Sequence, residues 1–277
     1  MKVLVAGASG YLGRHVTERF LSAGFNVYRY QRSNAGGVPI CCEPTRVDEV
    51  GLEDFDVVIN CARPHWSQYE PEQIAQIESE LLSKLELYAS PNAIKIHTSG
   101  VWLFGHATKA ELHRFEHKPF ESVERDVETI HQVLTRNWHV VYCPSLIYGG
   151  EDCQLRRILE EREDTAVDVA LPSIGYNQYV HVADVAQFYL DLVVSHACNG
   201  KQHFIAEDKG YSPLAFAERL QEYGVITCIN RYSWEKYQSK FASNAVDIEK
   251  LHLDLPISKH FSTNHKIDDY LAAWLES

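Results

Sequence analysis

The chain has 277 residues, of which 45% are hydrophobic and 23% charged, so it is neither disordered nor collagen-like and can bury the core of one large domain or of two joined ones. Its net charge of −12 at pH 7 disfavours nucleic acid and anionic membranes as partners, because both bind basic surfaces. We expect no transmembrane helix, since no run of about 18 apolar residues occurs, and no signal peptide, since the apolar N-terminus soon meets Gly7.

The chain opens with a predicted strand at Lys2–Ala6, a glycine-rich turn and a predicted helix at Arg14–Ala23. Gly7 allows a sharp turn, Gly10 lets backbone N–H groups approach a pyrophosphate, and Gly13 lets the helix pack close to the strands. In this strand–turn–helix context the spacing predicts a dinucleotide-binding turn. The alternative is a helix start that merely tolerates glycines.

Strands and helices alternate in the rest of the first half. The strands are short, unbroken apolar runs, which is typical of a parallel sheet with helices on both faces. Further strands are predicted at Asn26–Tyr30, Val38–Cys42, Asp56–Asn60, Ala93–His97 and His139–Cys143. Further helices are predicted at Val47–Leu52, Glu72–Tyr88 and Ser122–Arg136.

The pattern loosens after Gly150. The clearest helix is Ser212–Tyr223, where Ser212 is an N-cap and Pro213 takes the first helical position. The other helices are predicted at Leu155–Glu163, Ala183–Val194 and Ile267–Leu275, and short strands at Tyr179–Val182 and Gln202–Ala206.

Several segments resemble, in order and spacing, motifs of the extended short-chain dehydrogenase/reductase superfamily, the NAD-dependent epimerase/dehydratase family. They are Ala6–Gly13, Asp56–Ala62, His97–Gly105, Pro144–Gly149, Tyr179–Ala186 and Asn244–Leu253. The resemblance implies an α/β fold, a Rossmann doubly wound parallel sheet with a smaller C-terminal substrate-binding region. Residues 1–150 would form the NAD(P)-binding domain and 151–277 mainly the substrate-binding region, with 179–206 returning to the sheet.

The resemblance also implies which residues bind the cofactor. They are Gly7, Ser9, Gly10, Tyr11, Leu12, Gly13, Arg32, Cys61, Ala62, Arg63, Ser99 and Pro144. An acidic residue after the second strand would hydrogen-bond the ribose of NAD, but Gln31, Arg32 and Ser33 stand there. Arg32 can clamp a 2′-phosphate, which favours NADP over NAD, with NAD kept as an alternative. A solvated loop position for Arg32 is the other interpretation.

The family's proton-transfer residues are not at their expected positions. The family uses a tyrosine, a lysine four residues later and a serine or threonine. Alignment through Pro119 and Glu128 places Phe120 at the tyrosine position and Glu124 at the lysine position, and the usual hydroxyl position holds Gly100. No tyrosine occurs between residues 105 and 138, so the catalytic residues are unknown.

Three interpretations stay open. The chain is an atypical epimerase/dehydratase-like enzyme or oxidoreductase that acts on a small molecule through other groups. Alternatively, it is a non-catalytic NADP(H)-binding sensor or regulatory protein. In the third, the alignment is different and a tyrosine from elsewhere, Tyr148 or Tyr69, fills the role.

Substrate contacts are expected from Trp102, Asn177 and His181, because ligands of this fold bind beyond the carboxyl ends of the strands. A structural histidine beside Asp184 is the alternative for His181. In extended members of the family the helices that match Glu72–Tyr88 and Ser122–Arg136 often pair in a homodimer. Their apolar stripes equally suit packing on the sheet.

The seven cysteines form no CxxC pair, so we expect free thiols in a reducing cytoplasm and neither disulfides nor structural zinc. His113 and His117 lie four residues apart, but no third ligand is apparent near them. We expect this segment to be a solvated face and the protein to carry no metal site.

Overall fold

The computed structural model describes residues 1–30, 39–41, 54–65, 67–150, 152–160, 166–195 and 200–274. The chain forms two compact units whose segments alternate along the sequence. The sheet unit comprises Met1–Ser99, Arg125–Tyr142 and Val185–His203. The second unit comprises Gly100–Glu124, Cys143–Asp184 and Phe204–Ser277.

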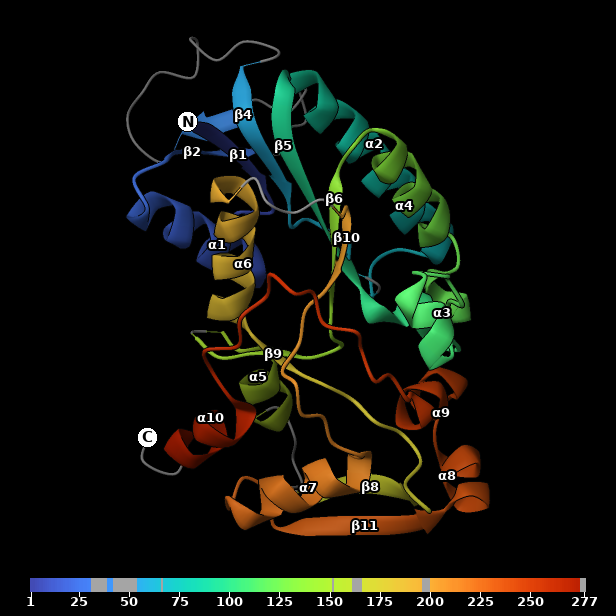
Figure 1. Cartoon of the computed structure of the whole chain (residues 1–277). Coiled ribbons are helices and arrows are strands. Elements are labelled where there is room, and N and C mark those ends of the chain that lie inside the picture. The colour runs from blue at the N-terminus through green and yellow to red at the C-terminus, as the bar shows by residue number, and fades with distance from the viewer. Residues whose placement is uncertain are drawn as a thin grey trace. The chain divides into compact units, whose positions relative to one another are not determined.

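The sheet unit is built on a seven-stranded sheet in the order β10-β6-β5-β4-β1-β2-β3 (Figure 1). Its strands are β1 (Lys2–Ala6), β2 (Asn26–Tyr30), β3 (Pro39–Cys41), β4 (Phe55–Asn60), β5 (Ala89–Gly100), β6 (His139–Cys143) and β10 (Gln202–Phe204). Six strands run parallel, and β3 pairs antiparallel with β2 at the edge. The predicted α/β class with a parallel Rossmann-type sheet is confirmed.

Helices cover both faces of this sheet. In Figure 1, α1 (Tyr11–Ser22) and α6 (Val182–Val194) lie on one face, and α2 (Pro71–Tyr88) and α4 (Asp126–Thr135) on the other. The central strand β1 is therefore apolar on both sides, and its residues 3–6 are fully buried. This double cover explains why the strands read as unbroken apolar runs in the sequence.

The helix-start signals read from the sequence are confirmed. The Ser212 hydroxyl accepts a hydrogen bond from the Ala215 N–H at 3.2 Å, and Pro213 opens α7 (Pro213–Glu222). One predicted helix is interrupted. The segment expected as Ser122–Arg136 has a 3₁₀ turn at Glu121–Val123, and α4 begins only at Asp126.

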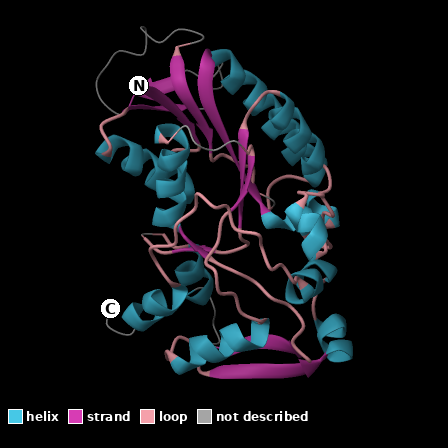
Figure 2. Cartoon of the chain, viewed as in Figure 1, coloured by secondary structure: helices cyan, strands magenta, loops and turns pink. Residues whose placement is uncertain are grey.

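The second unit contains two short parallel pairs. The strand β7 (Ile147–Tyr148) pairs with β9 (Val180–His181), and β8 (Ala166–Leu171) pairs with β11 (Cys228–Ser233). Figure 2 shows β8 and β11 as a small separate sheet beside α7. The other helices of the second unit are α3 (Lys109–His113), α5 (Gln154–Glu160), α8 (Trp234–Lys240), α9 (Ser243–Lys250) and α10 (Ile267–Trp274). A 3₁₀ turn spans Val101–Phe104.

The structure bears on three further expectations. The four cysteines whose side chains it describes are free: Cys61, Cys143, Cys153 and Cys228. Within the ranges given above, no helix has the length and apolar character to cross a membrane. The predicted helix at Val47–Leu52 lies outside the described residues.

Candidate functional site

The glycine turn after β1 lies directly against the chain leaving β4. Gly7 has a φ of +76°, which a glycine adopts without strain. A Cβ atom at Gly7 would lie 2.7 Å from the Ala62 backbone nitrogen and 2.8 Å from the Cys61 carbonyl carbon. Any larger residue at position 7 would therefore separate the two strand ends.

The helix α1 is equally close to the turn. A Cβ atom at Gly13 would overlap the Gly7 carbonyl oxygen and lie 2.6 Å from the Gly7 carbonyl carbon. The Gly10 N–H donates to the Gly7 carbonyl at 2.9 Å and closes the turn. Turn and helix thus form a cradle made of backbone, as the sequence predicted for Gly7 and Gly13.

The N-terminus of α1 is open to a ligand. Its N-cap is Gly10, no side chain caps it, and no acidic residue stands in its first turn. Ser9 and Gly10 are exposed, whereas Tyr11 and Leu12 are partly buried. Backbone N–H groups at the positive end of a helix dipole attract anions, so this terminus suits a phosphate.

Buried polar residues order the strand ends beside the turn. The Asn60 side-chain oxygen accepts from the Ala62 N–H at 3.0 Å, and its amide nitrogen lies 3.1 Å from His97 Nδ1. Burial, together with the nearby Arg63 charge, lowers the pKa of His97 to about 3, so His97 is neutral at physiological pH. Asn60 and His97 therefore act as a fixed support for the loop that carries Ala62.

Cys61 belongs to a chain of hydrogen bonds below this loop. The Thr98 hydroxyl donates to Cys61 Sγ at 3.7 Å and lies 2.7 Å from the Tyr189 hydroxyl. Burial raises the pKa of the Cys61 thiol to about 12, so the thiol stays protonated at neutral pH. Ser99, the next residue on β5, is partly buried.

Arg63 contacts two acidic side chains that were not predicted. Its guanidinium lies 3.2 Å from Glu78 Oε2 on α2 and 2.6 Å from Asp126 Oδ2 on α4. Burial raises the pKa of Glu78 to about 7, against the opposing effect of the Arg63 charge. Burial also raises the pKa of Asp126, and Arg63 again opposes the shift.

The sequence held a signal for both carboxylates. Glu78 falls within the stripe of α2 formed by Ile74, Leu81, Leu82 and Leu85, all of which are buried. A glutamate at that helical spacing is expected to face the interior, where it needs a cationic partner. Asp126 likewise falls on the buried face of α4.

The three positions where the family's proton-transfer residues would stand differ in their surroundings. Gly100 is exposed at the end of β5, and a Cβ atom there would meet nothing within 4 Å. Phe120 is 5% exposed, and a Cβ atom at Gly105 would overlap its ring. Glu124 is exposed. A side chain would fit at position 100, whereas the ring at 120 is part of a packed interior.

The two alternative tyrosines also differ. Tyr148 is fully buried, and burial together with the nearby Glu207 carboxylate raises the pKa of its hydroxyl. A phenol whose pKa is raised transfers a proton less readily, which disfavours Tyr148 as the acid/base. Tyr69 is 37% exposed.

The residues predicted to touch substrate have partners within the second unit. Trp102 Nε1 donates to the Ser145 hydroxyl at 2.7 Å, beside the buried Pro144. The backbone of Asn177 pairs with that of Tyr211 through two hydrogen bonds of 2.8 Å. Trp102 and Asn177 are partly buried, so each keeps exposed surface.

His181 lies in a more densely packed place. Its Nδ1 accepts from the Ala183 N–H at 3.1 Å, and its ring stacks on His265 with centroids 4.0 Å apart. His265 Nδ1 lies 2.8 Å from a carboxylate oxygen of Asp184, which is 2% exposed. These contacts favour the structural interpretation of His181 that the sequence left open.

Two further points of the sequence analysis concern Arg32 and the histidine pair His113 and His117. Arg32, on which the expectation of NADP rests, lies outside the described residues. Within the described residues, no group of three or more histidine, cysteine or acidic side chains could hold a metal ion. His113 ends α3, so His117 does not share a helix with it.

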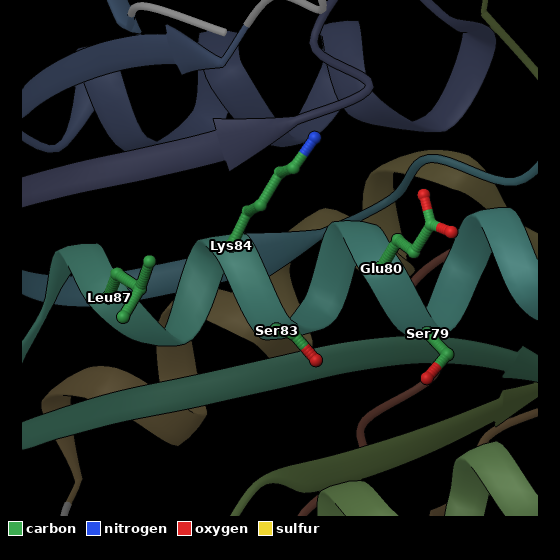
Figure 3. A pocket seen from close by; sticks show the side chains of 5 residues that line it. All are labelled: Ser79, Glu80, Ser83, Lys84 and Leu87. Atoms are coloured by element: carbon green, nitrogen blue, oxygen red, sulfur yellow. The ribbon is translucent and has the colours of Figure 1, made fainter. Parts of the chain in front are cut away.

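A hollow of about 380 Å³ lies on the surface of α2 (Figure 3). Its lining is formed by Ser79, Glu80, Ser83, Lys84 and Leu87. Ser79 donates to Gln132 of α4 at 3.1 Å. None of the five lining residues belongs to the predicted cofactor or substrate set, so the hollow is separate from the glycine turn.

Comparison with known proteins agrees with this geometry. Residues 3–123 match the model of the NAD dependent epimerase/dehydratase family. The match confirms, for this part of the chain, the resemblance drawn from its motifs. A search among curated protein sequences found no match.

Solved structures resemble the whole chain in fold. UDP-glucose 4-epimerase from Thermotoga maritima, solved with UDP-glucose, is 17% identical with a TM-score of 0.72, over 100% of this chain and 98% of that one. Human epimerase family protein SDR39U1, solved with NADPH, is 13% identical with a TM-score of 0.68, over 100% of both chains. MoeE5, in complex with UDP-glucose and NAD, is 17% identical with a TM-score of 0.69, over 100% and 98%. At these identities the likeness shows the fold.

Proposed function

We propose that the chain binds a nicotinamide dinucleotide at the glycine turn and acts on a small molecule as an epimerase/dehydratase-like enzyme or oxidoreductase. The observation that carries the proposal is the cradle itself. Gly7 and Gly13 leave no room for a side chain, and the adjoining helix N-terminus has no side-chain cap. The family match over residues 3–123 and the NADPH and NAD named with two structural relatives support it.

The residues fit the group that this proposal requires. The N–H groups of the first turn of α1 would hold the pyrophosphate, and the exposed Ser9 and Gly10 let it approach. Ala62, which lies against the turn, and Arg63, the next residue, would contact the cofactor farther along. When bound, a nicotinamide supplies hydride transfer. Preference for NADP over NAD remains a prediction from Arg32.

The proton-transfer step needs a group other than the usual tyrosine and lysine. On β5, the Thr98 hydroxyl already contacts Tyr189 and Cys61, which leaves the neighbouring Ser99 hydroxyl as the better candidate to orient a substrate oxygen. We expect substrate contacts from Trp102, Asn177 and, less directly, His181. UDP-glucose is named with two of the structural relatives, so a nucleotide sugar is the first substrate class to test.

A second candidate is a dinucleotide-binding sensor without turnover. The observation that favours it concerns the three positions of the family's proton-transfer residues. Gly100, Phe120 and Glu124 stand there, none of them is a proton donor of the usual kind, and the Phe120 ring is buried. A sensor would bind the dinucleotide tightly, and its association with a partner protein would depend on the cofactor.

The experiment that separates these functions measures both binding and turnover. Purified protein is titrated with NADPH and with NADH, and hydride transfer is followed over a panel of carbonyl compounds and nucleotide sugars. Turnover that Gly10→Val abolishes would establish the enzyme. Saturable binding without turnover on any panel member would favour the sensor.

We also propose a cytoplasmic protein that forms a homodimer through α2 and α4. The dimer is proposed from the resemblance of α2 and α4 to helices that pair in extended family members, and the exposed Leu87 on α2, 57% accessible, is the position chosen to test it. Sedimentation of wild-type protein and of Leu87→Glu tests it. A dimer is expected for the wild type, and a monomeric wild type would contradict the proposal.

A further inference from the structure

Arg63, Glu78 and Asp126 form an ion triad drawn from three different elements. Arg63 follows β4, Glu78 lies in the middle of α2, and Asp126 opens α4. The side chains of Glu78 and Asp126 are 2% and 8% exposed, whereas that of Arg63 is 42% exposed. The carboxylates are thus buried beneath a guanidinium that reaches the surface.

The guanidinium retains hydrogen-bonding capacity. It carries five N–H groups, and the two contacts to Glu78 and Asp126 use one on each terminal nitrogen. Within the described part of the chain these are its partners, so the remaining N–H groups are available on the exposed side. Two carboxylates that fix a guanidinium also reduce the entropy it loses when it binds a third group.

The place of Arg63 gives these donors a purpose. Arg63 directly follows Ala62, whose backbone packs against Gly7 in the glycine turn. Ligands of open parallel sheets bind outside the carboxyl ends of the strands, which is where the loop after β4 lies. Asp126, which holds Arg63, stands two residues after Glu124, the position that the resemblance assigns to the lysine that holds the nicotinamide ribose.

We propose that Glu78 and Asp126 are positioning residues that hold the Arg63 guanidinium at this edge, and that its remaining N–H groups donate to hydroxyl or carbonyl oxygens of the bound dinucleotide. Arg63 thereby supplies, from the β4 loop, the donor that position 124 lacks. This inference rests on the proposed function, because it requires a dinucleotide at the glycine turn.

The triad also links binding to protonation. Glu78 faces Arg63 and Asp126, and His97 on β5 is near enough to Arg63 to sense its charge but stays neutral. Ligand oxygens that accept hydrogen bonds from Arg63 weaken its pairing with the Glu78 carboxylate and so favour protonated Glu78. Binding then takes up a proton, and affinity falls as the pH rises from 6 to 8.

The test is a fluorescence titration with NADPH, and separately with NADH, at pH 6, 7 and 8. Arg63→Lys keeps the charge but cannot span two carboxylates and a ligand, so we expect binding about tenfold weaker at pH 6. Glu78→Gln should bind with an affinity that changes less with pH than the wild type. Glu80→Gln, on the exposed face of the same helix, is the matched control and should keep the wild-type pH dependence.

Thermal melting of Arg63→Lys checks its folding independently. Lysine is the substitution of choice because it retains a cation beside the two buried carboxylates, whereas Arg63→Gln would leave both without one. Wild-type affinity in a folded Arg63→Lys protein would overturn the inference while leaving the proposed function intact. A Glu78→Gln protein with the full wild-type pH dependence would also overturn it. Failure of the wild-type protein to bind either dinucleotide would instead remove the proposed function on which the inference rests.

Discussion

Gly13 has less room than its neighbours in the glycine turn, and this makes it the sharpest probe of that turn. In Gly13→Ala the new methyl group would overlap the Gly7 carbonyl oxygen, so α1 must move away from β1. We expect a loss of about 1–3 kcal/mol in the free energy of unfolding, together with loss of NADPH binding. Urea denaturation and a fluorescence titration measure the two effects.

Gly100→Ala is the control for this substitution. A Cβ atom there meets nothing within 4 Å, and the φ of −125° suits any residue. Its stability should equal that of the wild type. A Gly13→Ala protein as stable as Gly100→Ala, with unchanged affinity for NADPH, would show that α1 does not depend on close approach to the turn.

For single residues, the sequence predicted most successfully those features that depend only on the backbone of one short segment. The turn at Gly7, Gly10 and Gly13 was predicted because strand, glycines and helix are contiguous. Arg63 was predicted to bind cofactor, but its contact with Asp126 joins residues far apart in the sequence. Local spacing cannot show such a contact, because it depends on how α2 and α4 pack on the sheet.

At the scale of secondary-structure elements, Glu249 tests the contact between α9 and β8. Its carboxylate accepts a hydrogen bond from the Ala170 N–H of β8 at 2.9 Å, and burial raises its pKa from 4.5 to about 7. The folded protein therefore binds this proton more tightly than the unfolded chain. The contribution of protonated Glu249 to the free energy of unfolding is complete below about pH 4.5 and is lost as the pH rises to about 7. Above pH 7 the folded protein bears the full free-energy cost of an ionised, buried carboxylate.

Glu249→Gln should consequently be more stable than the wild type at pH 8, by about 1 kcal/mol, and lose this advantage near pH 4.5. Urea denaturation at both pH values measures the difference. Glu218→Gln, an exposed acid-to-amide change in the same unit, serves as the control. An equal difference between Glu249→Gln and wild type at both pH values would contradict the assignment of the raised pKa to Glu249.

Asp184, in the first turn of α6, ties the segment before α10 into the second unit. Its carboxylate accepts from the backbone N–H groups of Asn264 and His265 at 3.0 and 3.1 Å, and from the His265 ring. In Asp184→Ala these donors lose their acceptor, so we expect destabilisation of about 2–4 kcal/mol and faster proteolysis near residue 264. Thermal melting and limited proteolysis of Asp184→Ala, beside Asp208→Ala at an exposed position, measure it; equal behaviour of the two variants would contradict this role.

Most elements of the sheet unit were predictable because they carry a clear period. The errors have physical causes. The helix expected over Ser122–Arg136 is broken by a 3₁₀ turn, which its apolar periodicity did not reveal. The pair of β8 and β11 was missed because parallel pairing between distant segments leaves no local signal, and the β11 run mixes polar and apolar residues.

On the scale of the whole molecule, the fold class followed from alternating strands and helices. The sequence placed a boundary at residue 150 and expected 179–206 to return to the sheet. The segments of the two compact units alternate along the sequence, and Gly100–Glu124 groups with the second unit, which the apolar periodicity of the first half does not show. Which segments bind cofactor and which bind substrate stays a prediction.

The measurement that tests the central claim most directly is a fluorescence titration of wild-type protein and of Gly10→Val with NADPH and NADH. Gly10 has an extended backbone that valine can adopt, but its Cβ position lies 3.3 Å from the Gly7 oxygen, which is a tight contact, so valine should lower the stability somewhat while it blocks the approach of a pyrophosphate. We expect saturable binding by the wild type and its loss in a Gly10→Val protein that still melts cooperatively. A wild-type protein that binds neither dinucleotide, or a Gly10→Val protein that binds equally well, would contradict dinucleotide binding at the glycine turn.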